Sequence, residues 1–290
     1  MTGRTGYVTV EEGVRLFYQM RGEGSPTLIV PGACLLAADL EPLAENRTVL
    51  FYDDRGRGAS DPPADPWDIW TQYEVDDLEA IRRAFGLERI QLFGWAYFAG
   101  AAALYAMAYP ERVERMALVC PITPHYPAPY SDEVISLKRT EERIPLEALQ
   151  QLEQMQRDGL DESDPVAYCR AYSAVFTRQA MARPEALERM RSQPCLYSNE
   201  WPKNFMAHWQ SHFPESSWQR DWRAGLRTLA VPTLVVHGMH DLLPVEAAQE
   251  WVENLPQARL LRLEDAGHMP HREAPEAFFP ALQAFFSGEG

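Results

Sequence analysis

The stretch that decides the fold is Gly94-Trp95-Ala96-Tyr97-Phe98-Ala99-Gly100. It follows an apolar run at residues 90–93 and precedes an alanine-rich run at residues 101–108. A strand, a sharp turn and a buried helix in this order are typical of a nucleophile elbow, which raises the side chain at its apex above a sheet. The apex of this turn should be Ala96, whose methyl group cannot attack a substrate. The sequence therefore combines a catalytic setting with an inert residue at its centre.

Short apolar runs alternate with helical patterns on both sides of this turn. Continuous apolar runs of four to eight residues are typical of strands buried on both faces of a sheet. Strands are expected at residues 7–10, 14–20, 27–30, 48–52, 90–93, 116–119, 233–237 and 258–263. Because helical spacing separates most of them, the sequence predicts an α/β fold with a mostly parallel, doubly wound, eight-stranded sheet.

The pattern changes after the sixth expected strand. From residue 125 to residue 228 the sequence contains helical segments and many aromatic residues, but no convincing strand. We expect a helical lid at 125–228, inserted between two parts of the core at 1–124 and 229–290. Most of its rings should form a core of their own, and a few should line a pocket at the carboxyl edge of the sheet.

Charge and composition narrow the range of partners. The 290 residues carry a formal net charge of -15, which disfavours nucleic acid and anionic membranes, since both attract cations. The N-terminus has no apolar signal segment, and no apolar run approaches the roughly 20 residues that span a bilayer. The four cysteines form no CxxC pair, so we expect reduced thiols. These features predict a cytoplasmic protein.

Two further turns at strand ends hold candidate catalytic residues. Asp241 follows the strand at 233–237, and His268 follows the strand at 258–263. Chemistry in doubly wound sheets takes place at the carboxyl ends of the strands, so Ala96, Asp241 and His268 should meet at one edge. An imidazole that takes a proton and a carboxylate that fixes its tautomer are the partners that a nucleophile needs.

Together these motifs resemble the α/β-hydrolase superfamily, and within it the lidded serine hydrolases similar to prolyl aminopeptidases (proline iminopeptidases). The matching pieces are Pro31-Gly32-Ala33, residues 54–60, the elbow with residues 109–113, Val231-Pro232-Thr233 leading to residues 237–241, and Gly267-His268. The resemblance covers the core from end to end, whereas the lid matches loosely.

The resemblance implies a role for each of these positions. Ala96 stands where the family has its nucleophile, usually serine, while Asp241 becomes the acid and His268 the base. The backbone N–H groups of Tyr97 and Ala33 would form the oxyanion hole, because a developing negative charge needs fixed donors.

Further residues are expected at the substrate. Cys34, next to the oxyanion loop, should line the pocket, together with Trp95, Trp201 and Met269. In prolyl-aminopeptidase-like enzymes, lid carboxylates bind the free amine of the substrate, which makes Glu200 a candidate for that role. A solvated surface glutamate is an equal alternative for Glu200.

Two departures from the family pattern leave the function open. Phe98 occupies the place where the elbow normally has glycine, which puts its local geometry in doubt. Ala96 is interpreted first as an engineered Ser→Ala change, because the rest of the triad is present, in a hydrolase that cleaves an N-terminal aminoacyl or prolyl amide or an ester. It could also be natural, either in a small-molecule binder or in a lyase or isomerase of secondary metabolism that uses His268 as its base.

No cofactor or metal is implied by these motifs. The spacing His-x-x-His occurs at residues 237–240 and 268–271, but it is not well enough placed for a zinc site. We expect a small-molecule or short-peptide substrate, and the sequence leaves the oligomeric state open.

Overall fold

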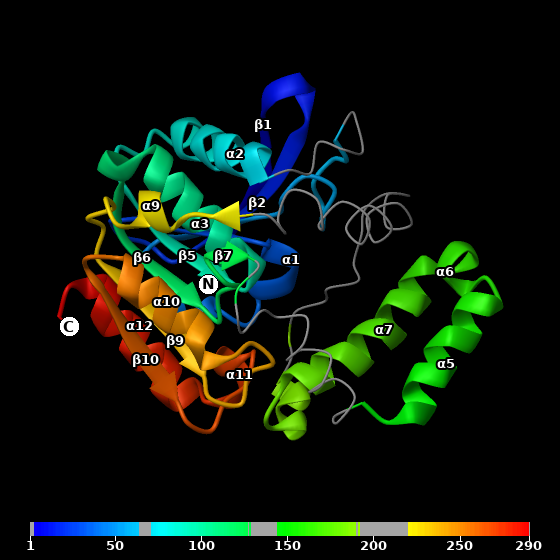
Figure 1. The fold of residues 1–290 in the computed structure, drawn as a ribbon. Helices are drawn as coiled ribbons and strands as arrows, with labels where there is room; N and C mark the ends of the chain where they lie inside the picture. The colour runs from blue at the N-terminus through cyan, green and yellow to red at the C-terminus, as the bar shows by residue number, and fades with distance from the viewer. Residues whose placement is uncertain are drawn as a thin grey trace.

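A computed structural model describes residues 3–63, 71–126, 128, 144–189, 191 and 220–289. Its main sheet has eight strands in the order β1-β2-β4-β3-β5-β6-β9-β10 (Figure 1). The strands are β1 (Arg4–Thr9), β2 (Arg15–Arg21), β3 (Leu28–Pro31), β4 (Val49–Tyr52), β5 (Ile90–Trp95), β6 (Val113–Val119), β9 (Thr233–Gly238) and β10 (Ala258–Leu263). Only β2 runs against its neighbours in this sheet, so the predicted eight-stranded, mostly parallel sheet is confirmed.

Helices cover both faces of the sheet. The helices of the core are α1 (Ala33–Leu36), α2 (Thr71–Ala84), α3 (Tyr97–Ala108), α9 (Arg223–Leu226), α10 (Val245–Asn254), α11 (Pro270–Glu273) and α12 (Pro275–Ser287), with short 3-10 turns at η1 (Glu11–Gly13), η2 (Glu41–Ala44) and η3 (Pro110–Arg112). Along β6, Met116 and Leu118 pack with α2, α3 and α10, whereas Ala117 and Val119 pack with α1 and α12. This alternation buries the central strands β3, β4, β5, β6 and β9 on both faces, as a doubly wound sheet requires.

Helices also form the described part of the insertion between β6 and β9. They are α5 (Leu146–Arg157), α6 (Leu160–Ser163), α7 (Pro165–Ala180) and η4 (Pro184–Arg189), and α5, α6 and α7 extend away from the sheet (Figure 1). The expectation that 125–228 contains no strand is wrong at its two ends. There, β7 (His125–Tyr126) pairs antiparallel with β8 (Arg220–Asp221). Two residues are too few to show an alternating pattern, so no local pattern indicates this ribbon.

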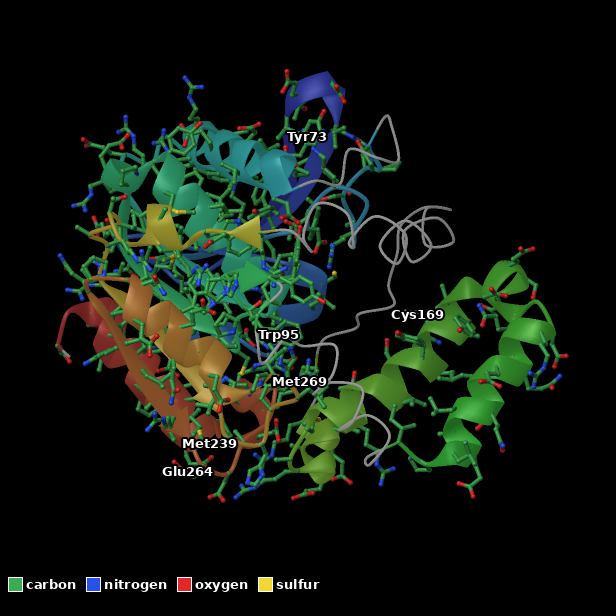
Figure 2. The ribbon with its side chains drawn as sticks, viewed as in Figure 1. Tyr73, Trp95, Cys169, Met239, Glu264 and Met269 are labelled. Atoms are coloured by element: carbon green, nitrogen blue, oxygen red, sulfur yellow. The ribbon has the colours of Figure 1, made fainter. Side chains whose placement is uncertain are left out.

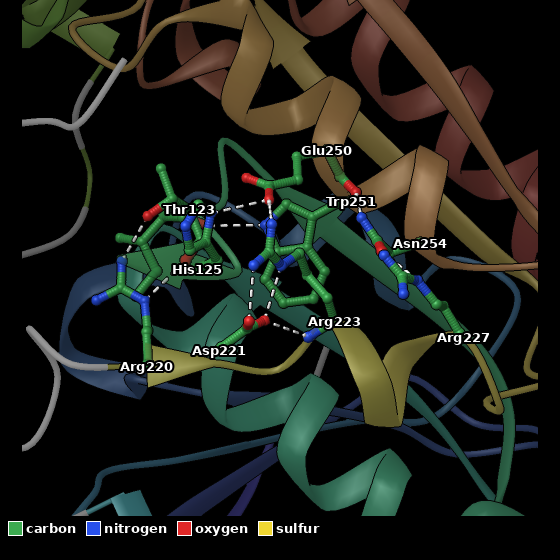
Figure 3. Close-up of polar contacts among 10 residues, drawn as sticks. Thr123, His125, Arg220, Asp221, Arg223, Arg227, Glu250, Trp251 and Asn254 are labelled. Atoms are coloured by element: carbon green, nitrogen blue, oxygen red, sulfur yellow. Dashed lines mark hydrogen bonds and ion pairs between the residues drawn. The ribbon is translucent and has the colours of Figure 1, made fainter. Parts of the chain in front are cut away.

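Polar contacts attach this ribbon to the core (Figure 3). Arg220 donates to the carbonyl and the hydroxyl oxygen of Thr123, each at 2.8 Å. Glu250 on α10 lies 3.0 Å from Nδ1 of His125 and 3.5 Å from Nη1 of Arg223. The chain therefore leaves the core and returns to it at neighbouring, tightly held points.

The thiols depart from the sequence-based expectation at one position. Cys34 and Cys120 are free thiols, but Cys169 on α7 is disulfide-bonded, so the expectation of reduced cysteines is wrong there. Spacing along the chain does not reveal which cysteines a fold brings together. Within the described ranges, none of the helices combines the length and the apolar character needed to cross a bilayer.

Close packing of β5 against α3 gives a first testable prediction. A Cβ atom on Gly94 would lie 2.5 Å from Cα of Ala99 and 2.6 Å from the carbonyl oxygen of Phe98. Both contacts are with backbone, which has little room to yield, so Gly94→Ala should lower the free energy of unfolding by about 3 kcal/mol in urea denaturation.

The control for this prediction is Gly86→Ala. Gly86 has φ +63° and open space around it, so its substitution should cost only about 1 kcal/mol of backbone strain. A loss of stability at Gly94 no larger than at Gly86 would contradict the steric explanation.

Candidate active site

The elbow forms a strained turn at the end of β5. Because β5 ends at Trp95 and α3 begins at Tyr97, Ala96 alone occupies the apex. Its φ of 52° and ψ of -118° lie in a region that side-chain-bearing residues rarely adopt. The Ala96 N–H donates to the carbonyl oxygen of Val119 at 2.9 Å, and this bond fixes the apex at the carboxyl edge of the sheet.

Phe98 is compatible with this turn. Its ring is 3% exposed, and the guanidinium of Arg57 lies 5.0 Å from the ring centroid. A Cβ atom on Gly32 would lie 2.9 Å from Cε2 of Phe98, so the ring fills the space beside the loop after β3. The close approach of helix and strand depends instead on Gly94 and Ala99.

Asp241 and His268 form a hydrogen-bonded pair at the same edge. Nδ1 of His268 lies 2.9 and 3.1 Å from the two carboxylate oxygens of Asp241. Burial favours a raised pKa for Asp241, but the charge of His268, its hydrogen bond and the charge of His237 outweigh it and lower the pKa. Asp241 is therefore ionised at neutral pH and holds the proton of His268 on Nδ1. This tautomer makes Nε2 the proton acceptor.

The Asp241 carboxylate is enclosed by buried side chains. Cys120 and His237 place potential ligand atoms within 4.8 Å of Asp241 and of one another, the only such trio in the part of the chain that the structure describes. Burial and the charge of Asp241 raise the pKa of the Cys120 thiol well above its usual value. In this trio, Asp241 already accepts hydrogen bonds from His268 and from the N–H of Leu243.

The second histidine of the pair at 268–271 has a different environment. His271 is 4% exposed and lies between the rings of Trp95 and Phe278, at centroid distances of 6.2 and 6.1 Å. Burial lowers the pKa of His271 to about 3, so it packs as a neutral aromatic ring at ordinary pH.

Trp95 joins the elbow to His268. Its indole N–H donates to the carbonyl oxygen of His268 at 2.7 Å, and the two ring centroids are 5.0 Å apart. Figure 2 shows Trp95 and Met269 near one another, close to the foot of α7. Met269 is 7% exposed and packs with Trp95 and Met181. The residue before Ala96 thus contacts the loop that carries His268.

A buried carboxylate shapes the loop after β3. Asp53, which is 2% exposed, accepts the N–H of Cys34 at 2.7 Å and the N–H of Ala59 at 3.0 Å. Because the Cys34 N–H is engaged in this way, Ala33 is the better candidate for an oxyanion donor from this loop. Burial and the charge of Asp53 raise the pKa of the Cys34 thiol well above its usual value, so Cys34 is not activated as a nucleophile.

Two further buried carboxyl groups, those of Glu74 and Asp54, lie near the elbow, and Glu74 contacts Tyr97. Glu74 on α2 accepts a hydrogen bond from the Tyr97 side chain. Its Oε2 and the Oδ2 of Asp54 are both shielded from solvent, with no hydrogen-bond partner among the described residues. Burial raises the pKa of Asp54 to about 7 although the positive charge of Arg57 acts in the opposite direction. Burial and the charge of Asp54 raise the pKa of Glu74 as well.

This environment predicts an unusual dependence of stability on pH. In the native state Asp54 keeps its proton up to pH values of about 7, whereas an unfolded aspartate loses its proton near pH 4. Native protein therefore binds more protons in this range, and Asp54 reduces stability as the pH rises. The free energy of unfolding should be measured by urea denaturation for Asp54→Asn and for the parent at pH 5 and at pH 8. The difference between variant and parent should shift in favour of the variant by about 2 to 3 kcal/mol from pH 5 to pH 8.

A suitable control for this measurement is Asp61→Asn. Asp61 pairs with Arg15 at 2.7 Å on the surface, and its hydrogen bond to Arg15 lowers its pKa. The contribution of Asp61 to the free energy of unfolding is therefore constant between pH 5 and pH 8. The explanation fails if Asp54→Asn has the same effect on stability at both pH values.

The structure thus places several sequence-derived candidates together. Ala96, Trp95, Asp241 and His268 converge at the carboxyl edge, with Tyr97, Ala33 and Cys34 on the elbow side. Glu200 and Trp201 lie outside the described residues. Sequence reasoning missed Asp53 and Glu74, which act through contacts with distant segments and lack a local pattern of their own.

Comparison with known proteins identifies the family to which this chain is related. A family model described as the alpha/beta hydrolase fold matches residues 34–275. A proline iminopeptidase from Heyndrickxia coagulans is 25% identical over 293 residues, which cover 97% of this chain and 98% of that protein. A putative 2-succinyl-6-hydroxy-2,4-cyclohexadiene-1-carboxylate synthase from Bacillus subtilis is 25% identical over 285 residues, which cover 97% of each.

Solved structures agree on the architecture. An alpha/beta fold family hydrolase from Bacillus anthracis superposes with a TM-score of 0.74 at 18% identity, covering 98% of this chain and 100% of that one. The family match spans most of the chain and includes Ala96, Asp241 and His268. The chain therefore belongs to the α/β-hydrolase fold family.

Proposed function

We propose that this protein is a hydrolase scaffold for acyl transfer to water by a Ser-His-Asp mechanism, with Ala96 in the place of the nucleophilic serine. The observation that carries the proposal is the hydrogen-bonded pair of His268 and Asp241 beside the strained apex at Ala96. A strained backbone persists where the surrounding structure holds it, which is common at active sites. We favour an engineered Ser→Ala substitution, because His268 and Asp241 form the hydrogen bond that a serine nucleophile would use.

In the active form, a serine at the apex would attack the substrate carbonyl. Nε2 of His268 would take the serine proton and return it to the leaving group, while Asp241 stabilises the imidazolium. The N–H groups of Tyr97 and Ala33 would hold the oxyanion. No step of this mechanism requires a cofactor. Without the hydroxyl, the chain should bind its substrate with little or no turnover.

The proposed substrate is an N-terminal aminoacyl or prolyl amide, or a small ester. The support for an amide comes from the proline iminopeptidase that matches this chain over nearly its whole length. Such a substrate carries a free amine next to the scissile carbonyl, and Glu200 is our candidate for binding that amine. A small molecule or a short peptide fits this assignment.

A second function is favoured by Ala96 itself. If alanine is natural here, the same pocket could use His268 as a general base without a covalent intermediate, as in an elimination or isomerisation, or could only bind a small molecule. A relative named as a synthase, at the same level of identity as the iminopeptidase, supports keeping this alternative.

The experiment that tests the proposal is a substrate panel for Ala96→Ser and the unaltered chain. The panel contains prolyl and other aminoacyl amides, the same amides with the amine acetylated, and simple esters and lactones. Faster hydrolysis of the free than of the acetylated amides would support an aminopeptidase, and cleavage of esters alone would point to an esterase. If Ala96→Ser hydrolyses none of them, the hydrolase proposal fails.

A further inference from the structure

The Glu273 carboxylate connects two parts of the protein. Glu273 ends α11, five residues after His268, and is 0% exposed. Its Oε1 accepts the N–H groups of Gly267 and Met269 at 3.0 and 3.2 Å, which flank His268 on both sides. A buried carboxylate is costly unless hydrogen bonds compensate it, so these bonds strongly favour one conformation of the His268 loop.

The other oxygen of Glu273 binds the foot of α7. Oε2 accepts the N–H of Ala182 at 2.6 Å and the N–H of Arg183 at 3.0 Å. These residues follow directly after α7, the longest described helix of the insertion. One carboxylate therefore receives two N–H groups from the His268 loop and two from the insertion.

A direct backbone contact reinforces this connection. The His268 N–H donates to the carbonyl oxygen of Ala180, the last residue of α7, at 2.8 Å. A Cβ atom on Gly267 would lie 2.6 Å from the same oxygen, so only glycine allows the approach. The foot of α7 and the His268 loop thus form a single hydrogen-bonded unit.

We propose that Glu273 is a positioning residue that holds His268 in register with Asp241 and ties it to the foot of α7. A displacement of α7 would then move the His268 imidazole, so that the position of α7 determines whether the base is aligned with Asp241. The role of His268 as a base rests on the proposed function, whereas the connection itself does not.

The test is Glu273→Gln in the unaltered chain, followed by NMR. The amide of glutamine can accept at only one of the two positions and directs N–H groups toward donors at the other. We expect the low-field proton signal of His268 Nδ1 to be lost or strongly broadened, and the backbone amide of His268 to exchange with solvent at least about tenfold faster. A loss of stability alone would move neither signal selectively.

The matched control is Glu264→Gln. Glu264 is exposed and lies in the same loop (Figure 2), so the variant has the same change of charge without the four contacts, and both signals should stay as in the parent. If Glu273→Gln leaves the Nδ1 signal and the exchange rate unchanged, the proposal is wrong.

A second variant covers the case in which Glu273→Gln does not fold. Ala182→Pro replaces the N–H at 2.6 Å with the ring carbon Cδ, which cannot donate and lies against the carboxylate. The extended backbone of Met181 (φ -101°, ψ 138°) suits a residue before proline. Faster exchange of the His268 amide is expected again, and an unchanged rate would overturn the link to α7. These readouts need no turnover, so a failure of the hydrolase proposal would be distinguishable from a failure of this one.

Discussion

Ala96→Ser is expected to raise the rate of hydrolysis of the best panel substrate by about 10³ to 10⁶ over the unaltered chain. The backbone of Ala96 already has the strained conformation of the apex, with φ 52° and ψ -118°. Serine adds one oxygen to the existing Cβ and requires no change of the turn. The measurement compares initial rates of both proteins, together with mass-spectrometric detection of an active-site-directed phosphonate on residue 96.

The control for this gain is the double variant Ala96→Ser, His268→Ala. A serine without its base should lose the phosphonate label and most of the rate, because its hydroxyl is weakly nucleophilic unless a base takes the proton. A trace rate in the unaltered chain is compatible with the mechanism, since binding and an oxyanion hole alone can accelerate a reaction by about 10³ to 10⁴. If Ala96→Ser shows neither the phosphonate label nor a higher rate of hydrolysis, a serine hydrolase is excluded.

Asp241→Asn in the Ala96→Ser background should reduce kcat by about 10⁴ with little change in KM. The Asp241 carboxylate accepts the Nδ1 proton of His268 at 2.9 Å and is fully buried. Asparagine has the same shape, but its amide can donate to Nδ1 and stabilise the opposite tautomer, in which Nε2 carries the proton and cannot act as a base. Steady-state kinetics on the best substrate give both parameters.

Asp265→Asn is the matched control for this variant. Asp265 lies in the His268 loop and pairs with Arg183 at 3.4 Å, with its side chain 74% exposed. Exposed pairs contribute little, so kcat should change less than about twofold. A comparable loss of kcat at both aspartates, or a loss below tenfold at Asp241, would show that Asp241 is not the acid of the mechanism.

The sequence was sufficient to predict the sheet and its carboxyl edge. Continuous apolar runs are a strong signal because the central strands are buried on both faces, as Met116 and Ala117 illustrate by packing on opposite sides of β6. Asp241 and His268 could be placed because both follow such runs directly. The contact between them then follows from the neighbouring positions of β9 and β10 in the sheet.

Other features could not be predicted because they depend on contacts between distant segments. The β7–β8 ribbon joins residues about ninety-five positions apart, with two residues in each strand. Glu273 binds Ala182 across a similar separation, and nothing in the sequence near either residue indicates the other. The ring of Phe98 fits only because Gly32, in the loop after β3, has no side chain.

The β7–β8 ribbon has a consequence for how such proteins diversify. Tyr126 pairs with Arg220, so the sheet domain meets its insertion through two adjacent chain crossings. The entropic cost of closing a loop rises by only about 0.6 kcal/mol for each doubling of its length. Evolution can therefore lengthen or shorten the insertion between these crossings while the sheet stays intact, provided that the foot of α7 keeps its hydrogen bonds to Glu273 and His268.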